Sequence, residues 1–265
     1  MSVITDLFHQ TDRALLIPYA VGGYPDLTSC AALLDVYVDS GVRLLEIGIP
    51  FSDPLADGPV IQAASQVALR RGVRPLDVLA LAERVARRGV RVVCLSYLNT
   101  ILALGPARFF DACARHGVAG VVVPDLPVEE AQELKGQAAQ NGLDLILLAA
   151  PTSTDDRLAR IAAAASGFIY CVSTTGVTGA RASLRADLPQ FVARLRKHTD
   201  LPLAVGFGVS SAEQVAAVAS YADGVIVGSA LVGLVKEGGG FKGSLREIAR
   251  FLGQAQEALG EPVTG

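Results

Sequence analysis

Eight short apolar runs recur along the 265 residues of the chain, and segments with helical spacing separate them. The runs are nearly continuous in Val, Ile, Leu and Ala instead of alternating with polar residues. Such continuity is typical of strands that are buried on both faces, as in a parallel sheet. The expected strands are residues 15–20, 43–48, 90–96, 118–123, 143–149, 168–172, 202–206 and 223–227.

The segments between these runs carry the apolar periodicity of helices. It is clearest in 76–88, 107–116 and 128–141. Ser210 and Glu213 form a capping-box pattern that predicts a further helix over 212–220.

Eight strands with helices between them, in about 250 residues, match the arithmetic of an α/β protein with a (β/α)8 TIM barrel. We expect a single TIM-barrel domain over residues 1–265, with a short extra N-terminal helix and a phosphate-binding extra helix after strand 8. A doubly wound sheet is the alternative, but it usually has fewer strands and a glycine-rich fingerprint after the first one. Gly22 and Gly23 follow the first run without completing that fingerprint, which favours the barrel.

Charge, cysteine and histidine usage exclude several functions. The chain has 26 acidic and 23 basic residues, for a formal net charge of −3, which argues against a nucleic-acid partner. No apolar stretch reaches the roughly 18 residues of a membrane span, and residues 1–11 lack a signal-peptide pattern. Four separate cysteines without a CxxC pair indicate a reducing cytoplasm. Three scattered histidines argue against a zinc site, and we expect no metal.

A carboxylate interrupts the second apolar run. Glu46 could point outward and pair with a basic residue. However, both faces of a barrel strand are covered, so a charge there is costly unless it is paired or used. Burial would raise the pKa of Glu46, which suits proton transfer near neutral pH.

The loop after that strand contains Asp53 and Asp57 among prolines and a glycine. Either aspartate could simply form a turn, and Asp57 could act near the N-terminus of a helix that starts near Val60. In a barrel, however, this loop lies at the C-terminal ends of the strands, where catalytic groups gather. Glu46 and Asp57 can then face one pocket and take different protonation roles.

Glycines follow the seventh and eighth strands, in Gly-Phe-Gly-Val-Ser at 206–210 and Gly-Ser-Ala at 228–230. Glycines let backbone amides approach an anion, and a helix that begins at about Ser229 would direct its N–H groups toward it. The loops after these two strands are the usual phosphate site of such barrels. The pattern predicts a phosphorylated ligand. The alternative is that the glycines are needed only for tight turns between strand and helix.

The loop that follows the sixth strand is long and polar, and it contains glycine. Its first part, residues 173–181, precedes a helix expected to start near Leu188. Such a loop is typical of a mobile lid. Arg181 and Arg185 could attract an anionic substrate or could simply be solvated.

Taken together, these motifs resemble the tryptophan synthase alpha subunit family. The most specific is residues 45–59, Leu-Glu-Ile-Gly-Ile-Pro-Phe-Ser-Asp-Pro-Leu-Ala-Asp-Gly-Pro, followed by Val-Ile-Gln62. Later motifs at 123–130, 176–179, 206–210 and 228–229 follow in the family's order. The resemblance covers essentially the whole chain.

The resemblance implies a retro-aldol cleavage of indole-3-glycerol phosphate into indole and glyceraldehyde 3-phosphate. By the motif match, Glu46 would protonate indole C3 and handle the glycerol hydroxyl proton. Asp57 would accept the indole N–H and stabilise the positive charge that develops on the ring. Other residues that the resemblance places at the substrate are Tyr19, Tyr170, Thr178, Gly179, Phe207, Gly208, Gly228 and Ser229.

The resemblance also implies a partner. The family's alpha subunit pairs with a pyridoxal-phosphate-dependent beta subunit in an αββα complex, and Asp53 and Asn99 match residues that communicate with it. We therefore expect no cofactor in this chain and pyridoxal phosphate (PLP) in the partner. A stand-alone indole-3-glycerol phosphate lyase that releases free indole shares the same motifs and stays the alternative.

Two other classes fit the residues less well. A barrel that is kept only to activate a beta subunit would have lost Glu46 or Asp57, and both are present. A phosphosugar epimerase or isomerase would need metal-binding histidines or another base at the strand ends.

Overall fold

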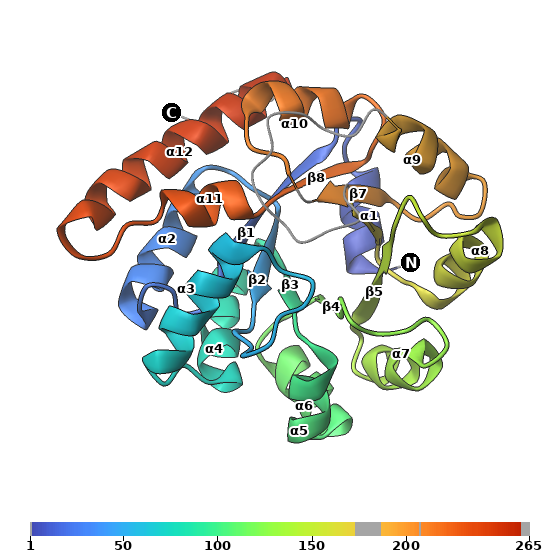
Figure 1. Ribbon diagram of the computed structural model, residues 1–265, viewed down its shortest axis with the longest axis horizontal. Helices are drawn as coiled ribbons and strands as arrows, with labels where there is room; N and C mark the ends of the chain where they lie inside the picture. The colour runs from blue at the N-terminus through green and yellow to red at the C-terminus, as the bar shows by residue number, and fades with distance from the viewer. Residues whose placement is uncertain (1, 173–186, 207, 261–265) are drawn as a thin grey trace.

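In the computed structural model, eight parallel strands pair in chain order and close into a barrel (Figure 1). The structure describes residues 2–172, 187–206 and 208–260. The strands are β1 (Leu15–Val21), β2 (Leu44–Gly48), β3 (Arg91–Leu95), β4 (Gly120–Val122), β5 (Asp144–Ala149), β6 (Ile169–Val172), β7 (Leu203–Gly206) and β8 (Gly224–Val227). The predicted TIM barrel is confirmed, and each expected strand agrees with the observed one to within two residues at either end.

Helices surround the barrel and cover its outer face, except α1, which lies at one end (Figure 1). They are α1 (Val3–His9), α2 (Leu27–Asp39), α3 (Pro59–Arg70), α4 (Pro75–Ala86), α5 (Leu98–Leu104), α6 (Pro106–Arg115), α7 (Ala131–Gln140), α8 (Asp155–Ala164), α9 (Leu188–Arg196), α10 (Ala212–Ala219), α11 (Ser229–Leu234) and α12 (Phe241–Ala258), with a 3-10 turn η1 (Gly238–Gly240). The short N-terminal helix and the extra helix after strand 8 are both present. None of the described helices is long and apolar enough to cross a bilayer.

The start of α10 corrects one sequence expectation. Ser211, not Ser210, is the N-cap, and its side chain accepts a hydrogen bond from the backbone N–H of Gln214. The Gln214 side chain in turn accepts from the backbone N–H of Ser210. The prediction was off by one residue because Ser210 and Ser211 are adjacent and either can cap a helix.

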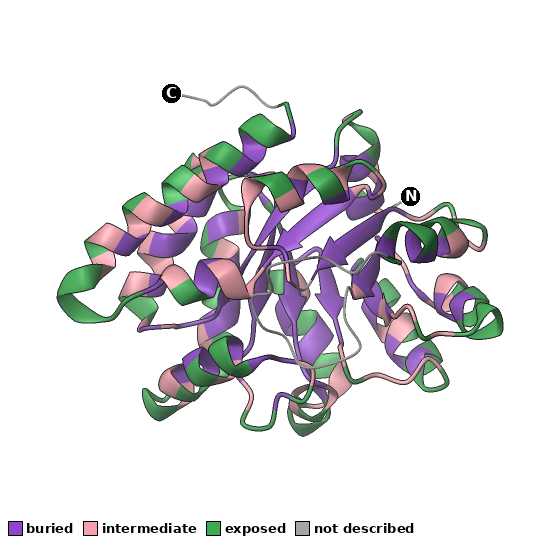
Figure 2. Ribbon diagram, turned by 45° about the horizontal axis from the view of Figure 1, so that its top comes forward, coloured by how far each residue is buried: buried purple, intermediate pink, exposed green. Residues whose placement is uncertain are grey.

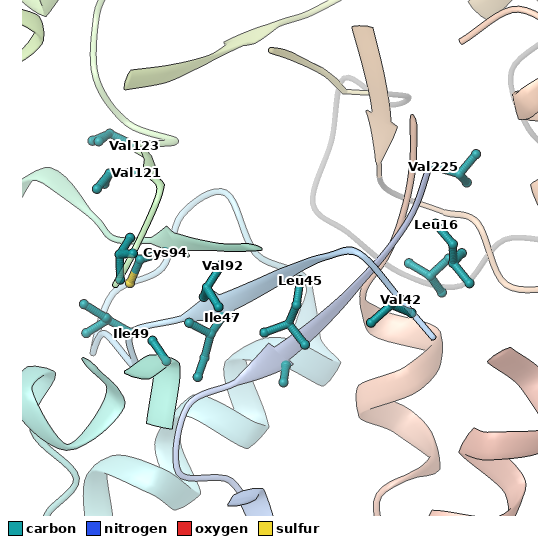
Figure 3. Close-up of a cluster of buried hydrophobic side chains, with 14 of the residues drawn as sticks. Leu16, Val42, Leu45, Ile47, Ile49, Val92, Cys94, Val121, Val123 and Val225 are labelled. Carbon is teal, nitrogen blue, oxygen red and sulfur yellow. The ribbon is translucent and has the colours of Figure 1, made fainter. Parts of the chain in front are cut away.

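Alternation along the strands divides the core into two layers. Leu45 and Ile47 of β2 pack outward in the layer between barrel and helices (Figure 3), whereas Leu44 packs inside the barrel. Because successive side chains of a strand point to opposite faces, Glu46 lies on the same inner face as Leu44. Figure 2 shows the strands buried along their length while the helices are exposed on one side.

Helix α1 covers the N-terminal end of the barrel. Ile4 and Phe8 join the inner apolar cluster, with the Phe8 ring centroid 5.7 Å from that of Phe168. The hydroxyl of Thr5 donates to the backbone oxygen of Gly167 at 2.9 Å. With this end covered by α1, a site inside the barrel is expected at the C-terminal ends of the strands.

Candidate active site

Glu46 is a carboxyl group in an apolar interior. It is 1% exposed, and β2 pairs it with Tyr19 of β1 and Val93 of β3. Neither carboxyl oxygen has a hydrogen-bond partner among the residues that the structure describes. Burial, and secondarily the nearby Asp57 charge, raises the pKa of Glu46 to about 8. The group is therefore mostly protonated at neutral pH and can act as an acid.

Asp57 lies in the β2–α3 loop and is 6% exposed. The hydroxyl of Tyr97 donates to its Oδ2 at 3.1 Å. Burial raises the pKa of Asp57 to about 6, and the hydrogen bond from Tyr97 opposes that rise. The N-cap of α3 is Gly58, which makes no side-chain cap bond, so the Asp57 carboxylate is directed to Tyr97 and does not cap the helix.

A cavity at the C-terminal end of the barrel brings these groups together. Its empty volume is about 390 Å³. Its lining residues are Tyr19, Glu46, Asp57, Ile61, Leu95, Tyr170, Gly208, Gly228 and Ser229. Residues predicted from five separate sequence windows thus face one space, together with the apolar side chains of Ile61 and Leu95.

The remaining sequence-predicted residues are placed differently. Thr178, Gly179 and Phe207 lie outside the described residues, as does the expected lid at 173–181. Asp53 and Asn99 do not line the cavity and are exposed on the β2–α3 loop and on α5.

Two strand-end glycines make room for the two tyrosines. A Cβ at Gly48 would overlap the Tyr19 hydroxyl, and a Cβ at Gly206 would overlap the Tyr170 hydroxyl. Burial raises the pKa of both tyrosines well above the ordinary value, so each keeps its hydroxyl proton. The sequence predicted the tyrosines but gave Gly48 no role, because its neighbour lies on the adjacent strand.

Tyr97 is the main site residue that the sequence analysis missed. Its ring stacks on Phe51, with the centroids 5.0 Å apart, and its oxygen accepts a hydrogen bond from the Ala56 N–H at 3.1 Å. The same hydroxyl holds Asp57. Its position, two residues after the end of β3, would have singled it out as a strand-end residue.

The described residues contain no group of three His, Cys, Asp or Glu side chains that could hold a metal ion. Three side chains that do not line the cavity have other surroundings, and the two cysteines among them are buried as their apolar runs predict. His116 Nδ1 lies 2.8 Å from a Glu83 oxygen, and Cys94 and Cys171 are buried thiols.

Comparison with known proteins adds an independent result. A family model described as tryptophan synthase alpha chain matches residues 6–259. A Roseiflexus castenholzii protein of that name is 47% identical over 95% of this chain and 99% of its own length. A Dehalococcoides mccartyi protein of the same name is 45% identical over 98% of this chain and 100% of its own length. A structure of Mycobacterium tuberculosis tryptophan synthase superposes with a TM-score of 0.90 at 40% identity, covering 97% of this chain and 98% of that one.

Proposed function

The chain belongs to the tryptophan synthase alpha chain family, and we propose that Glu46 and Asp57 are the two carboxyl groups that carry its reaction. The enzyme is a lyase of tryptophan biosynthesis that cleaves indole-3-glycerol phosphate into indole and glyceraldehyde 3-phosphate. The observation that supports the residue assignment is the pair itself. Two buried carboxyl groups with different pKa values share one cavity with strand-end glycines.

Glu46 acts as the general acid and then as the base. With a pKa of about 8 it is protonated at neutral pH, so it can deliver a proton to C3 of the indole ring. The resulting carboxylate takes the proton of the glycerol hydroxyl as that C–O bond becomes a carbonyl. The carbon–carbon bond breaks, its electron pair returns to the ring, and Glu46 is protonated again.

Asp57 acts as an anion. Its pKa of about 6 leaves it mostly ionised at pH 7. Protonation of C3 places positive charge on the indole nitrogen, and a buried carboxylate that accepts a hydrogen bond from the ring N–H stabilises this charge. The donation from Tyr97 supports this role, because it favours the charged form of Asp57.

The phosphate group of the substrate binds at Gly208, Gly228 and Ser229. All three line the cavity, and α11 begins at Ser229, so its first N–H groups face this end. A Cβ added at Gly228 would lie 3.6 Å from the Tyr19 side chain and 3.8 Å from Ile61, so it would take up space beside two residues that line the cavity. Thr178, Gly179 and Phe207 complete this binding region in our proposal.

The indole ring occupies the apolar part of the cavity. Ile61 and Leu95 contribute aliphatic surface there. Tyr19 and Tyr170 contribute aromatic rings and hydroxyls in the same space. A flat apolar ring with one N–H fits a pocket of this composition.

A beta subunit binds the surface that surrounds the β2–α3 loop and α5. Asp53 and Asn99 are exposed there, and Leu55 at the tip of the loop is 84% exposed. A groove next to α5 is lined by Leu98, Leu102, Pro106, Leu126, Glu129, Glu130, Gln132, Glu133 and Leu134. Exposed leucines beside a partly apolar groove are typical of a protein interface.

Family membership is consistent with an alpha chain that holds no cofactor of its own, and we place PLP in the beta partner. The partner would use the indole that this chain releases. The stand-alone lyase is not favoured, because the relatives that match nearly the whole chain carry the alpha chain name.

The test is indole release from indole-3-glycerol phosphate by the purified chain, alone and with a tryptophan synthase beta subunit. Slow release that rises by orders of magnitude with the partner supports the proposal. Fast release by the chain alone would favour the stand-alone lyase. No release in either condition would mean that the carboxyl pair has been assigned wrongly.

A further inference from the structure

Gln62 is the last residue of the long motif, and the mechanism above gives it no task. It lies in the first turn of α3 and is half-buried. Its side-chain amide, Nε2, donates to the backbone oxygen of Asp57 at 2.9 Å and lies 3.5 Å from that of Pro54. One side chain therefore contacts the backbone at both ends of the loop segment Pro54–Asp57.

This segment is a tight turn. The backbone N–H of Asp57 donates to the oxygen of Pro54 at 3.0 Å, which is the bond that closes a four-residue turn. The carbonyl groups of both end residues then lie within reach of one amide, and Gln62 uses that arrangement. If the two contacts of Gln62 were broken, only the backbone bond from Asp57 to Pro54 would hold the turn on the side that faces α3.

The opposite side of the turn is held by Tyr97. Its hydroxyl accepts from the Ala56 N–H and donates to the Asp57 carboxylate. Besides the turn bond from its N–H, Asp57 is thus held at its backbone oxygen by Gln62 and at its carboxylate by Tyr97. A peptide unit held at only one point can rotate, and rotation at Asp57 would move the carboxylate away from the space it shares with Glu46.

We propose that Gln62 is a positioning residue that locks the Pro54–Asp57 turn and thereby aims the Asp57 carboxylate at the reacting ring. The inference rests on the proposed role of Asp57. Gln62 does not touch the substrate in this account and acts only through the backbone of Asp57.

The main test is Gln62→Met, which keeps the length of the side chain but removes the donor. Small displacements of a catalytic group can cost up to about 100-fold in rate, so we expect kcat to fall by about tenfold or more. We expect KM to change by less than about twofold, because the proposed phosphate site lies at β7 and β8. Gln66→Met, on the exposed side of the same helix, is the matched control and should behave as wild type.

A double-mutant cycle separates positioning from a general loss of structure. If Gln62 acts through the Asp57 carboxylate, Asp57→Asn combined with Gln62→Met should be no slower than Asp57→Asn alone. Rates are measured with enzyme in excess over indole-3-glycerol phosphate. Multiplying defects, or a normal kcat in Gln62→Met, would overturn the inference.

Two further arms keep the result interpretable. An Asp57→Asn variant as fast as wild type would refute the proposed role of Asp57 itself, which is a different failure. If Gln62→Met does not fold by circular dichroism, Gln62→Asn keeps an amide that is one methylene too short and enters the same cycle.

Discussion

The hydroxyl of Tyr97, just after β3, donates a hydrogen bond to Oδ2 of Asp57 in the loop after β2, at 3.1 Å. The same oxygen accepts from Ala56, so its proton is committed to the carboxylate. This arrangement favours the ionised form of Asp57 against the effect of burial. The hydrogen bond links Asp57, which the sequence motif identifies, to Tyr97, which lies outside that motif.

Replacing Tyr97 by Phe should raise the pKa of Asp57 above its present value of about 6, because the substitution removes the hydrogen bond that lowers it. The acidic limb of the kcat profile should then move to higher pH. A hydrogen bond to a charged group contributes about 1.5–3 kcal/mol, so kcat at pH 7 should fall about tenfold or more. Indole release measured from pH 5 to 9 checks both effects. An unshifted limb would contradict the role of Tyr97.

Glu46→Gln should abolish cleavage while substrate still binds, because an amide cannot supply the proton. Loss of turnover with retained binding of indole-3-glycerol phosphate, measured by calorimetry, is the expected result. Aspartate at this position is a useful comparison, since it keeps an acid but withdraws it by one methylene. Normal turnover in Glu46→Gln would end the acid–base assignment.

The same variant should change how stability depends on pH. The pKa of Glu46 is raised to about 8 in the folded chain from 4.5, so the folded state holds this proton more tightly than the unfolded state does. The contribution is fully present below pH 4.5 and is lost as pH rises toward 8. Glutamine does not titrate, so Glu46→Gln lacks this pH-dependent loss. The free energy of unfolding of the variant should therefore rise relative to that of wild type as the pH increases from 4.5 to 8. Urea unfolding at several pH values measures it, and a constant difference would argue against a shifted pKa.

Asp57→Asn should keep the shape of the site but remove its negative charge. Removing one preorganised electrostatic group typically costs about 10²–10³ in kcat. We expect a loss of that order with little change in KM, measured by single-turnover indole release. A loss below about tenfold would count against Asp57 as the stabiliser of ring charge.

Gly48→Ala should disturb Tyr19, because the added Cβ overlaps the Tyr19 ring and hydroxyl. Overpacking in a full core typically costs about 1–3 kcal/mol, and kcat should fall as the tyrosine moves in the cavity. Tyr19→Phe in the same chain removes the closest atom and should restore part of the lost stability. Thermal unfolding of the single and double variants tests this. Additive losses would show that the two residues do not interact.

The barrel and its two carboxyl groups could be predicted from the sequence because both are local patterns. Continuous apolar runs identify strands buried on both faces, and Glu46 is conspicuous in such a run. Tyr97 and Gly48 could not be assigned in this way. Their roles depend on neighbours from other segments, Asp57 in one case and Tyr19 in the other. The capping serine of α10 was missed by one position because adjacent serines offer equivalent side chains.

The division of β2 into an inner and an outer set of side chains has a consequence for how this enzyme can change. Shifting the strand by one residue would exchange the two sets. Glu46 would then face the aliphatic layer beneath the helices, and Leu45 or Ile47 would occupy the reaction chamber. Insertions or deletions within this strand can therefore keep Glu46 in the cavity only when they add or remove an even number of residues. The loop that carries Asp57 has no alternating faces, so this restriction does not apply to it.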